Sequence, residues 1–344
     1  MARKLINVFL LLEWWVLLLT AAEVFAQSHD PINDDNSNWF RCKGCSQLLA
    51  QSRDPLYDVC FIGKRLISVG YHGAILMSDD GGNKWERIPI GSKEALASLC
   101  FPDSEHGWAV GSHGTIITTS DGGLVWKPQN SGTSKYLFGV YFVNPQKGWV
   151  VGDSGTILYT SDGGDHWQAQ ESGETESMLE GVRFLDEDRG FVVGEFGTIL
   201  STSDGGNNWT SVFKREEEIL DIDVIQKMRA TLYSLDFLDD RIGVAVGVGG
   251  CIVRTQDGGT TWEEVSSPTT NHLYRVKSIN GDLYAVGLRG TLVSSLNQGQ
   301  TWRLHSLPPE VSLFWYYGIA GEPKEIFLAG ENGEILKLAT GIRK

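Results

Sequence analysis

The chain is short of positive charge. Its 344 residues include 29 Lys and Arg against 43 Asp and Glu, which gives a formal net charge of -14 at pH 7. Nucleic acids and anionic lipid surfaces attract proteins through clustered Lys and Arg that neutralise phosphate. The shortage therefore argues against nucleic acid or an anionic membrane as the main partner.

Cysteine is scarce as well, and its five copies make an odd number. Cys42 and Cys45 form a CxxC pair, but the sequence has no second CxxC and no His pair at metal-site spacing, so no metal site is predicted. In an exported protein this pair forms either a local disulfide or two free thiols, and both alternatives stay open. Cys60, Cys100 and Cys251 are expected to be buried small hydrophobes, Cys251 on a strand.

What the sequence has in abundance is one repeated pattern, rich in glycine. The first copy runs Val69-Gly70-x-x-Gly73-x-Ile75-x-x-Ser78-x-Asp80-x-Gly82-x-x-Trp85. Later copies end at tryptophans separated by 41, 41, 42, 53 and 40 residues: Trp126, Trp167, Trp209, Trp262 and Trp302. A seventh frame at 329–335 lacks both the Asp and the Trp. Repetition at a fixed period indicates one supersecondary unit used seven times.

A period of roughly 40 to 45 residues is the length of one four-stranded propeller blade. We therefore predict an all-β, seven-bladed β-propeller over residues 38–340. In the third unit, strands are expected at 139–142, 148–151, 156–160 and 167–170. The last unit supplies only three strands, so a stretch within 38–54 is expected to add the missing outer strand and to remove the open sheet edge.

Five of the repeats carry the Ser/Thr-x-Asp-x-Gly-x-x-Trp run of an Asp-box. Its carboxylates are Asp80, Asp121, Asp162, Asp204 and Asp257, and its aromatic residues are Trp85, Trp126, Trp167, Trp209 and Trp262, with Asn297 replacing the acid in the sixth copy. A short acceptor at the head of a tight turn bonds backbone N–H groups two or three residues on. The carboxylates are interpreted as structural, with no catalytic or metal role, because copies spread around a ring meet no single substrate.

The N-terminus indicates export. Arg3 and Lys4 precede an apolar run over 5–19, and a small-residue cleavage site ends at Ala26, so 1–26 is predicted to be a signal peptide. The alternative is an uncleaved membrane anchor, which Glu13 and Glu23 would make costly. Residues 27–37 are polar and turn-rich and are expected to be a disordered lead-in.

One unit breaks the period with a surplus near 214–230. An acidic start, a basic end and apolar residues at helical spacing, including Ile219 and Ile222, predict a short amphipathic helix. This helix is either a lid that packs on the ring or a docking element for a partner protein. Both interpretations stay open.

The full Val-Gly-x-x-Gly-x-Ile-x-x-Ser/Thr-x-Asp-Gly-Gly-x-x-Trp frame resembles that of the photosystem II stability and assembly factor family. The resemblance covers nearly all of 38–340. It implies a non-enzymatic chaperone that binds a protein client on the lumenal side of the thylakoid and takes no cofactor. The residues before the second glycine of each frame keep an arginine only at Arg289, which indicates a divergent bacterial relative, exported to the periplasm or, in a photosynthetic host, to the thylakoid lumen.

Candidate partner-binding residues follow from propeller geometry. Turns between second and third strands and connections between blades emerge on one face, so His72, His113 and Arg289 are expected to share a face with Ile219 and Ile222 of the insert. Function is usually carried by such loops on a rigid scaffold. A protein client is therefore predicted, with no nucleic acid and no small-molecule substrate.

Two other functions remain as alternatives. Asp-box propellers of the sortilin kind bind carbohydrate or peptide, and sialidases combine Asp-boxes with three carboxylate-gripping arginines. Arg183, Arg275 and Arg303 are the candidates for such a triad, and Arg87-Ile88-Pro89 matches a sialidase triplet but follows the first Asp-box. The glycosidase is the least favoured of these functions, because no paired carboxylates at a defined separation can be inferred.

Overall fold

Seven four-stranded antiparallel sheets form the fold. The computed structural model describes residues 48–49, 54–173, 177–213 and 231–339. Chain positions 39–344 form one compact unit that contains every described residue. The predicted signal peptide, the lead-in, the Cys42–Cys45 pair and the insert at 214–230 lie outside the described residues.

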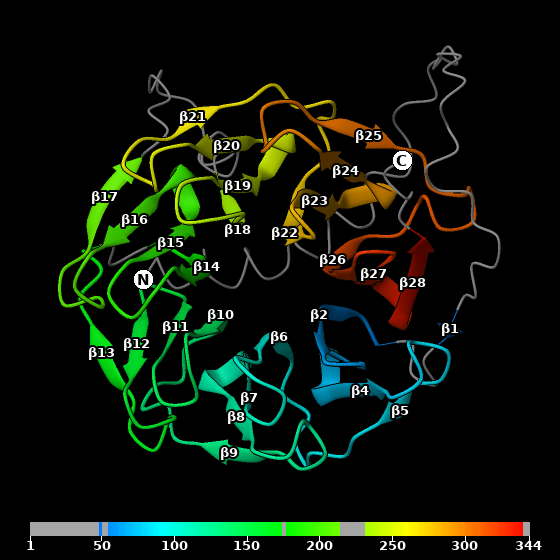
Figure 1. The fold of residues 1–344 in the computed structure, drawn as a ribbon. Coiled ribbons are helices and arrows are strands. Elements are labelled where there is room, and N and C mark those ends of the chain that lie inside the picture. Colours follow the sequence, from blue (N-terminus) through cyan, green and yellow to red (C-terminus); the bar gives the residue numbers. More distant parts are fainter. Residues whose placement is uncertain (1–47, 50–53, 174–176, 214–230, 340–344) are drawn as a thin grey trace, which may run out of the picture. The chain divides into compact units, whose positions relative to one another are not determined.

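The innermost strand of each blade contacts the innermost strand of the next, and β26 contacts β2 to complete the ring. Figure 1 shows blue β2 beside the orange and red strands of the last blade. The innermost strands are β2 (Leu56–Ile62), β6 (Leu96–Cys100), β10 (Leu137–Phe142), β14 (Leu179–Phe184), β18 (Leu232–Phe237), β22 (Leu273–Ile279) and β26 (Tyr316–Glu322). The second strands are β3 (Arg65–Gly70), β7 (Gly107–Gly111), β11 (Gly148–Gly152), β15 (Gly190–Gly194), β19 (Gly243–Gly247), β23 (Asp282–Gly287) and β27 (Glu325–Gly330).

Third and outer strands complete each sheet. The third strands are β4 (Ala74–Ser78), β8 (Ile116–Thr119), β12 (Ile157–Thr160), β16 (Ile199–Thr202), β20 (Ile252–Thr255), β24 (Leu292–Ser295) and β28 (Glu334–Ala339). The outer strands are β5 (Glu86–Arg87), β9 (Lys127–Gln129), β13 (Gln168–Gln170), β17 (Thr210–Phe213), β21 (Glu263–Glu264), β25 (Arg303–His305) and β1 (Leu48–Leu49). The predicted strands of the third unit are confirmed, with ends shifted by two residues or fewer.

The predicted closure by the N-terminal region is confirmed. The last blade has the strand order β1-β28-β27-β26, and β1 pairs antiparallel with β28 through Leu48 opposite Ile335. The first described strand of the chain therefore shares a sheet with the last. Without β1, the edge of β28 would be open to other strands.

The hydrophobic core lies between the blades. In the described part of the chain, seven buried clusters each join residues of two neighbouring sheets, and the cluster between blades five and six combines Val244 and Val246 with Leu273 and Val276. The second strands are buried along their whole length in several blades, as in Gly148–Gly152. Strands covered on both faces favour continuous Val, Leu and Ile, which the sequence supplies.

Candidate protein-binding face

A tight turn joins the second and third strands of each blade. It forms a single 3-10 turn in six blades: η2 (Tyr71–Gly73), η3 (Ser112–Gly114), η4 (Glu195–Gly197), η5 (Val248–Gly250), η6 (Leu288–Gly290) and η7 (Glu331–Gly333). The middle residue is left-handed, with φ of 51° at His72, 52° at His113 and 53° at Arg289. A non-glycine residue in this region costs about 1 kcal/mol or more. The contacts around each turn therefore hold its middle residue in the left-handed backbone conformation.

The two glycines that flank each turn differ in conformation. Gly70 is extended with φ -172°, and Gly73 is left-handed with φ 63°. A Cβ on Gly70 would stand 2.1 Å from the carbonyl oxygen of Pro55. The next N–H, on Tyr71, donates a hydrogen bond to that same oxygen at 2.9 Å. Gly70 is required because the blade-to-blade connection passes so close.

These turns and the blade-to-blade connections lie on one face, which we call the turn face. The N–H of Gly114 donates to the Lys135 carbonyl at 2.7 Å, and the N–H of Gly290 donates to the Phe314 carbonyl at 2.6 Å. Lys135 and Phe314 both precede the innermost strand of the following blade. Residues 214–230 also connect two blades, between β17 and β18, but Ile219 and Ile222 lie outside the described residues.

The predicted partner-binding side chains stand at equivalent turn positions of different blades. The side chain of His113 is 78% exposed, and its Nδ1 lies 2.7 Å from Glu94. His72 Nδ1 lies 3.1 Å from Asp54, which also pairs with Arg87. Hydrogen bonds from Ser112 and His113 lower the pKa of the Glu94 carboxyl. Each His thus already has a carboxylate neighbour on its own blade-to-blade connection.

Arg289 differs from the two histidines. It is exposed on η6, and within the described ranges no Asp or Glu forms an ion pair with it. The structure brings His72 and His113 to adjacent blades and Arg289 to the sixth blade, so the three do not form one cluster. Arg289 is therefore an exposed cation of this face that is open to a partner's carboxylate.

Sequence reasoning missed the residues that face the propeller axis. The second residue of every innermost strand is partly exposed and follows a buried residue, and this set is Tyr57, Ala97, Phe138, Glu180, Tyr233, Tyr274 and Tyr317. Four of its tyrosines contact one another in series, with ring centroids 5.4 Å apart for Tyr233 and Tyr274, 5.0 Å for Tyr274 and Tyr317, and 5.5 Å for Tyr317 and Tyr57. Because innermost strands begin at the turn face, these aromatic rings lie where the axis opens onto it.

A belt of polar contacts crosses the blade boundaries deeper along the same strands. Arg183 donates to the Tyr141 hydroxyl and pairs with Asp236, Nε to Oδ1 at 3.1 Å. Asp236 also accepts the N–H of Ser278 at 2.9 Å and lies 3.9 Å from Lys277 Nζ. Burial is compensated here by opposite charge and hydrogen bonds, as polar groups removed from water require.

The belt continues through blades six, one and two. Arg275 Nη2 lies 3.4 Å from Asp58 Oδ2, and the same carboxylate oxygen accepts the N–H of Leu99 at 3.1 Å. Arg183 and Arg275 are therefore both paired with carboxylates, those of Asp236 and Asp58, whereas Arg303 is exposed on the outer strand β25. The three arginines required for a sialidase site do not converge, and that hypothesis for them is wrong.

The cysteines of the innermost strands lie at the blade boundaries. Cys60 and Cys100 occupy equivalent positions on β2 and β6 and pack against the hydrophobic clusters there, as predicted, but they are partly buried and not fully so. Cys100 Sγ accepts the N–H of Phe142 at 3.3 Å, a contact that joins blades two and three. Cys251 precedes β20 instead of lying on it.

The axial carboxyl Glu180 stands apart from the paired acids. Partial enclosure and the Glu195 carboxylate raise the pKa of Glu180 to about 8, while Arg275 opposes the shift. No hydrogen bond to its side chain comes from the described part of the chain. A carboxyl without donors in a poorly solvated place favours its neutral form.

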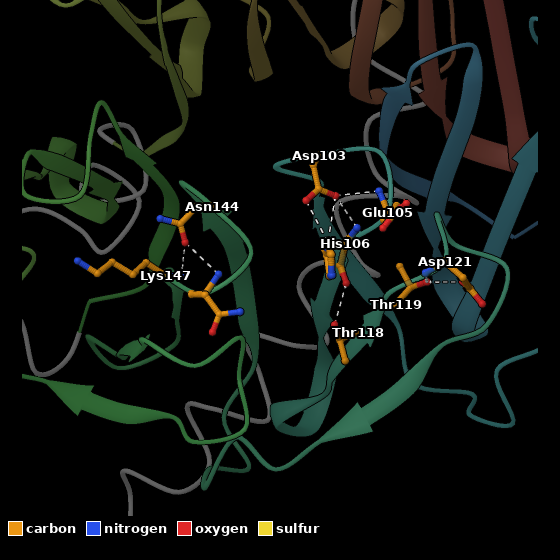
Figure 2. A network of polar contacts seen from close by, with 10 residues as sticks. Asp103, Glu105, His106, Thr118, Thr119, Asp121, Asn144 and Lys147 are labelled. Atoms are coloured by element: carbon orange, nitrogen blue, oxygen red, sulfur yellow. Dashed lines mark hydrogen bonds and ion pairs between the residues drawn. The ribbon is translucent and has the colours of Figure 1, made fainter.

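The opposite face is built from Asp-box turns and from the turns between first and second strands. The N–H of Gly122 donates to the Glu105 carbonyl at 2.8 Å, which joins the two kinds of turn in blade two. Asp121 Oδ1 accepts the N–H groups of Leu124 and Val125, each at 3.0 Å, so the accepted groups lie three and four residues on, one further than expected. In Figure 2 the Thr119 hydroxyl points at the same carboxylate, to which it donates at 2.7 Å.

The other Asp-box carboxylates bond their own turns in the same manner. The pKa of the Asp162 carboxyl falls to about 2 through bonds from the backbone N–H and the ring of His166, and that of Asp257 falls to about 2 through the Thr261 hydroxyl and N–H. Asp80 and Asp204 likewise accept the N–H four residues on, from Lys84 at 2.8 Å and Asn208 at 2.9 Å. The carboxylates of these acids therefore accept hydrogen bonds from the turns that they begin.

The Asp-box tryptophans pack beside those turns. Trp126 and Trp262 are 8% and 6% exposed, and each indole N–H donates to a glycine carbonyl of its own turn. Trp85 is partly exposed and makes the same bond. Trp167 and Trp209, also partly exposed, donate instead to Gln129 and Gln170 of the preceding blade.

A pocket of about 400 Å³ opens between blades two and three on this face, lined by His106, Thr118, Asp121, Lys127 and Gln129. Figure 2 shows His106 beside Asp103 and Thr119 beside Asp121, each pair within its own turn. Asp103 accepts the N–H groups of Glu105 and His106 at 2.8 and 2.7 Å, and Asn144 accepts the N–H of Lys147 at 2.9 Å. The Asp103 and Asn144 side chains thus hold the backbone of turns on this face.

Among the described residues, no three His, Cys, Asp or Glu side chains gather as they would around a metal ion. Nor does any helix in the same ranges have the length and apolar character needed to cross a lipid bilayer.

The sequence matches the family model of the photosynthesis system II assembly factor YCF48. Three overlapping matches cover residues 85–169, 126–217 and 170–265, which together span 85–265 and more than half of the chain. The chain belongs to this family. The predicted resemblance is therefore confirmed, while the search of curated protein sequences found no match.

Solved structures of the YCF48 family have the same fold. A structure described as YCF48 bound to D1 peptide is 20% identical, with a TM-score of 0.68 and coverage of 86% of this chain and 95% of that one. YCF48 from Cyanidioschyzon merolae is also 20% identical, with a TM-score of 0.66 over 85% of this chain and 98% of that one. Virginiamycin B lyase from Staphylococcus aureus, at 15% identity, has a TM-score of 0.70 over 87% and 99% of the two chains. Likeness at these identities establishes the propeller fold alone.

Proposed function

We propose that this chain is a non-enzymatic assembly factor that binds a protein client of the D1 type on its turn face. The observation that carries the proposal is its membership of the YCF48 family, of which one solved structure is described as bound to a D1 peptide. A binding scaffold needs no cofactor, and none is proposed. A carbohydrate- or peptide-binding module of the sortilin kind is the alternative.

The contrast between the two faces supports this choice of surface. Carboxylates of the Asp-box face are taken up by their own backbone turns, whereas the turn face presents exposed His113 and Arg289 on backbone that its neighbours hold in one conformation. Binding to a preformed surface avoids the entropy cost of ordering loops. The turn face is thus suited to holding an extended segment of another protein.

We also propose that the protein is exported. The apolar segment that follows Arg3 and Lys4 motivates this, with the periplasm or the thylakoid lumen as destination. N-terminal sequencing of the mature protein from fractionated cells tests it. Residue 27 at the N-terminus is the expected result, and recovery from the cytoplasm with Met1 retained would contradict export.

The test of client binding is affinity capture from the host's envelope fraction, with overlapping synthetic peptides of the host's D1 protein measured in parallel. Specific recovery of a reaction-centre subunit, and saturable binding of one peptide region, are expected. Arg303→Glu on the outer strand is the matched control because it changes charge away from the turn face. Capture of the client by a variant with the turn face neutralised, equal to that of the natural protein, would contradict the proposal.

A further inference from the structure

The axial opening of the turn face combines aromatic rings with acids. We call Tyr57, Glu180, Tyr233, Tyr274 and Tyr317 the axial cluster. Its four tyrosines run over blades five, six, seven and one with successive ring centroids 5.0 to 5.5 Å apart. Glu180 stands on blade four, next in the ring, and its charge acts on Tyr233.

The acids near this cluster lack cations. Glu195 acts on Glu180 and Tyr233, and Glu331 acts on Tyr274 and Tyr317. Across the described residues, none of these three carboxyls forms an ion pair, although Glu195 accepts the N–H of Met178 at 2.8 Å. A row of aromatic rings with unpaired carboxyls at its side is chemically complementary to a cation.

The nearby positive group is already engaged. Arg275 pairs with Asp58 at 3.4 Å, and its Nε donates to the Tyr317 carbonyl at 3.4 Å. It therefore extends along the strands beneath the tyrosines and does not neutralise Glu180, whose pKa stays raised. Positive charge for the axial cluster has to come from outside this part of the chain.

We propose that the axial cluster binds the ammonium or guanidinium group of a Lys or Arg side chain that a client peptide inserts along the propeller axis. A cation over an aromatic face is attracted by the ring quadrupole, more strongly where water is excluded, and a carboxylate adds charge-assisted hydrogen bonds. This proposal rests on the proposed function, because the client protein is what supplies the peptide. The chain's net charge of -14 favours a basic partner segment in the same way.

Proton release accompanies this recognition. Groups that face Glu180 are Glu195 on η4, Arg275 on β22, Tyr233 on β18 and Tyr136 before β10. An inserted cation stabilises the ionised form of Glu180, so the carboxyl loses its proton when the peptide binds. Because the free carboxyl has a pKa of about 8, binding is expected to be about tenfold tighter or more at pH 8 than at pH 6.

The probe is an acetylated and amidated Gly-Ser-Gly-Lys-Gly-Ser-Gly peptide, titrated at low salt and followed by NMR. The matched probe carries norleucine in place of lysine. We expect the lysine peptide to bind at least about tenfold more tightly, since norleucine has a similar apolar stem and no charge. Equal binding of the two probes would overturn the proposal.

Variants separate recognition from folding. Glu180→Gln is expected to weaken the lysine peptide about tenfold and to remove the pH dependence, Tyr274→Phe to retain binding through its ring, and Tyr274→Leu to lose it. Glu105→Gln, on the Asp-box face, is the control and is expected to bind as the natural protein does. Thermal unfolding confirms that each variant is folded. A Glu180→Gln protein that binds the lysine peptide with unchanged affinity would overturn the proposal.

The two proposals fail differently. If the natural protein captures its client but the lysine peptide does not bind and Glu180→Gln changes nothing, the axial site is wrong and the assembly function stands. If the lysine peptide binds with the expected dependence on Glu180 but no client is captured, the axial site stands and the client is wrong.

Discussion

Arg275 of blade six reaches past blade seven to Asp58 of blade one, with Nη2 and Oδ2 3.4 Å apart. Blade seven makes room by having Gly318 at the equivalent position, where a Cβ would lie 2.8 Å from Asp58 Cα. The ion pair therefore spans the blade whose sheet is completed by two distant parts of the chain. Ring closure therefore involves the Arg275–Asp58 ion pair in addition to the backbone pairing of β1 with β28.

Removal of the Arg275–Asp58 ion pair is expected to destabilise the ring. Arg275→Met leaves the buried Asp58 carboxylate without its cation, at a cost of about 2 kcal/mol in the free energy of unfolding. Urea denaturation measures the loss. Arg303→Met on the outer strand is the matched control, with a change within about 0.5 kcal/mol expected. Equal effects of the two substitutions would show that the Arg275 pair contributes nothing special to closure.

Asp121→Ala tests the role of the Asp-box acids. The change deletes the acceptor of the Leu124 and Val125 N–H groups, so a loss of about 1 to 2 kcal/mol in stability is expected, with client capture retained. Asp162→Ala is expected to act in the same way. A variant that keeps the stability of the natural protein but no longer captures client would assign these acids to binding.

Acid stability is expected to depend on the same turns. The folded pKa of Asp257 is about 2, below its ordinary value of 3.8. A depressed carboxyl pKa contributes stability above the unfolded value, and the contribution is lost as pH falls through the folded one. The urea midpoint should thus decline from about pH 4 to pH 2, and Asp257→Asn should reduce that decline.

Blade six supplies a natural precedent for the asparagine variant. Asn297 Oδ1 already accepts the N–H of Thr301 at 3.0 Å and the Ser295 hydroxyl at 2.9 Å. An amide oxygen makes these bonds without a charge to titrate. If the natural protein and Asp257→Asn lose stability in parallel over this pH range, acid sensitivity originates elsewhere.

Arg289→Glu addresses the turn face as a docking surface. The reversal removes an exposed cation that no described acid pairs with, so weaker client capture and unchanged thermal unfolding are expected. Deletion of 215–229 should have the same effect if Ile219 and Ile222 contact the client. Asn332→Glu, at the equivalent position of blade seven, controls for added negative charge. Undiminished capture by both Arg289→Glu and the deletion would place docking elsewhere.

Deletion of 38–54 is expected to lower the thermal midpoint sharply, because it removes β1 and opens the edge of β28. Deletion of 27–37 is the control, and its midpoint should match that of the natural protein. Closure by β1 would be unimportant for stability if both deletions unfolded at the same temperature.

The regular part of the fold was predictable because its signals are local. A glycine pair, an acid and a tryptophan at constant spacing identify each blade, and the missing fourth strand of the last unit indicated closure from the N-terminal side. The role of Gly70 was not predictable, since it depends on Pro55 of the preceding connection lying 2.1 Å from a hypothetical Cβ. Such a restriction exists only once the chain has folded.

The axial residues could not be assigned from sequence for a related reason. Tyr57 and Tyr317 are in contact although one begins the first blade and the other the last. Arg183 and Arg275 were noted only as possible sialidase cations, and their actual partners Asp236 and Asp58 lie on other blades. One available signal was the recurrence of tyrosine as the second residue of the innermost strand, in Leu56-Tyr57, Leu232-Tyr233, Leu273-Tyr274 and Tyr316-Tyr317.

The pairing of β1 with β28 imposes an order on biosynthesis. Leu48 belongs to the first described strand, and its partner Ile335 belongs to the last, β28. Blades one to six can each form a complete sheet from contiguous sequence, but blade seven needs β1 in addition to β26, β27 and β28. While the chain is being synthesised, the ring therefore cannot close before β28 has been made.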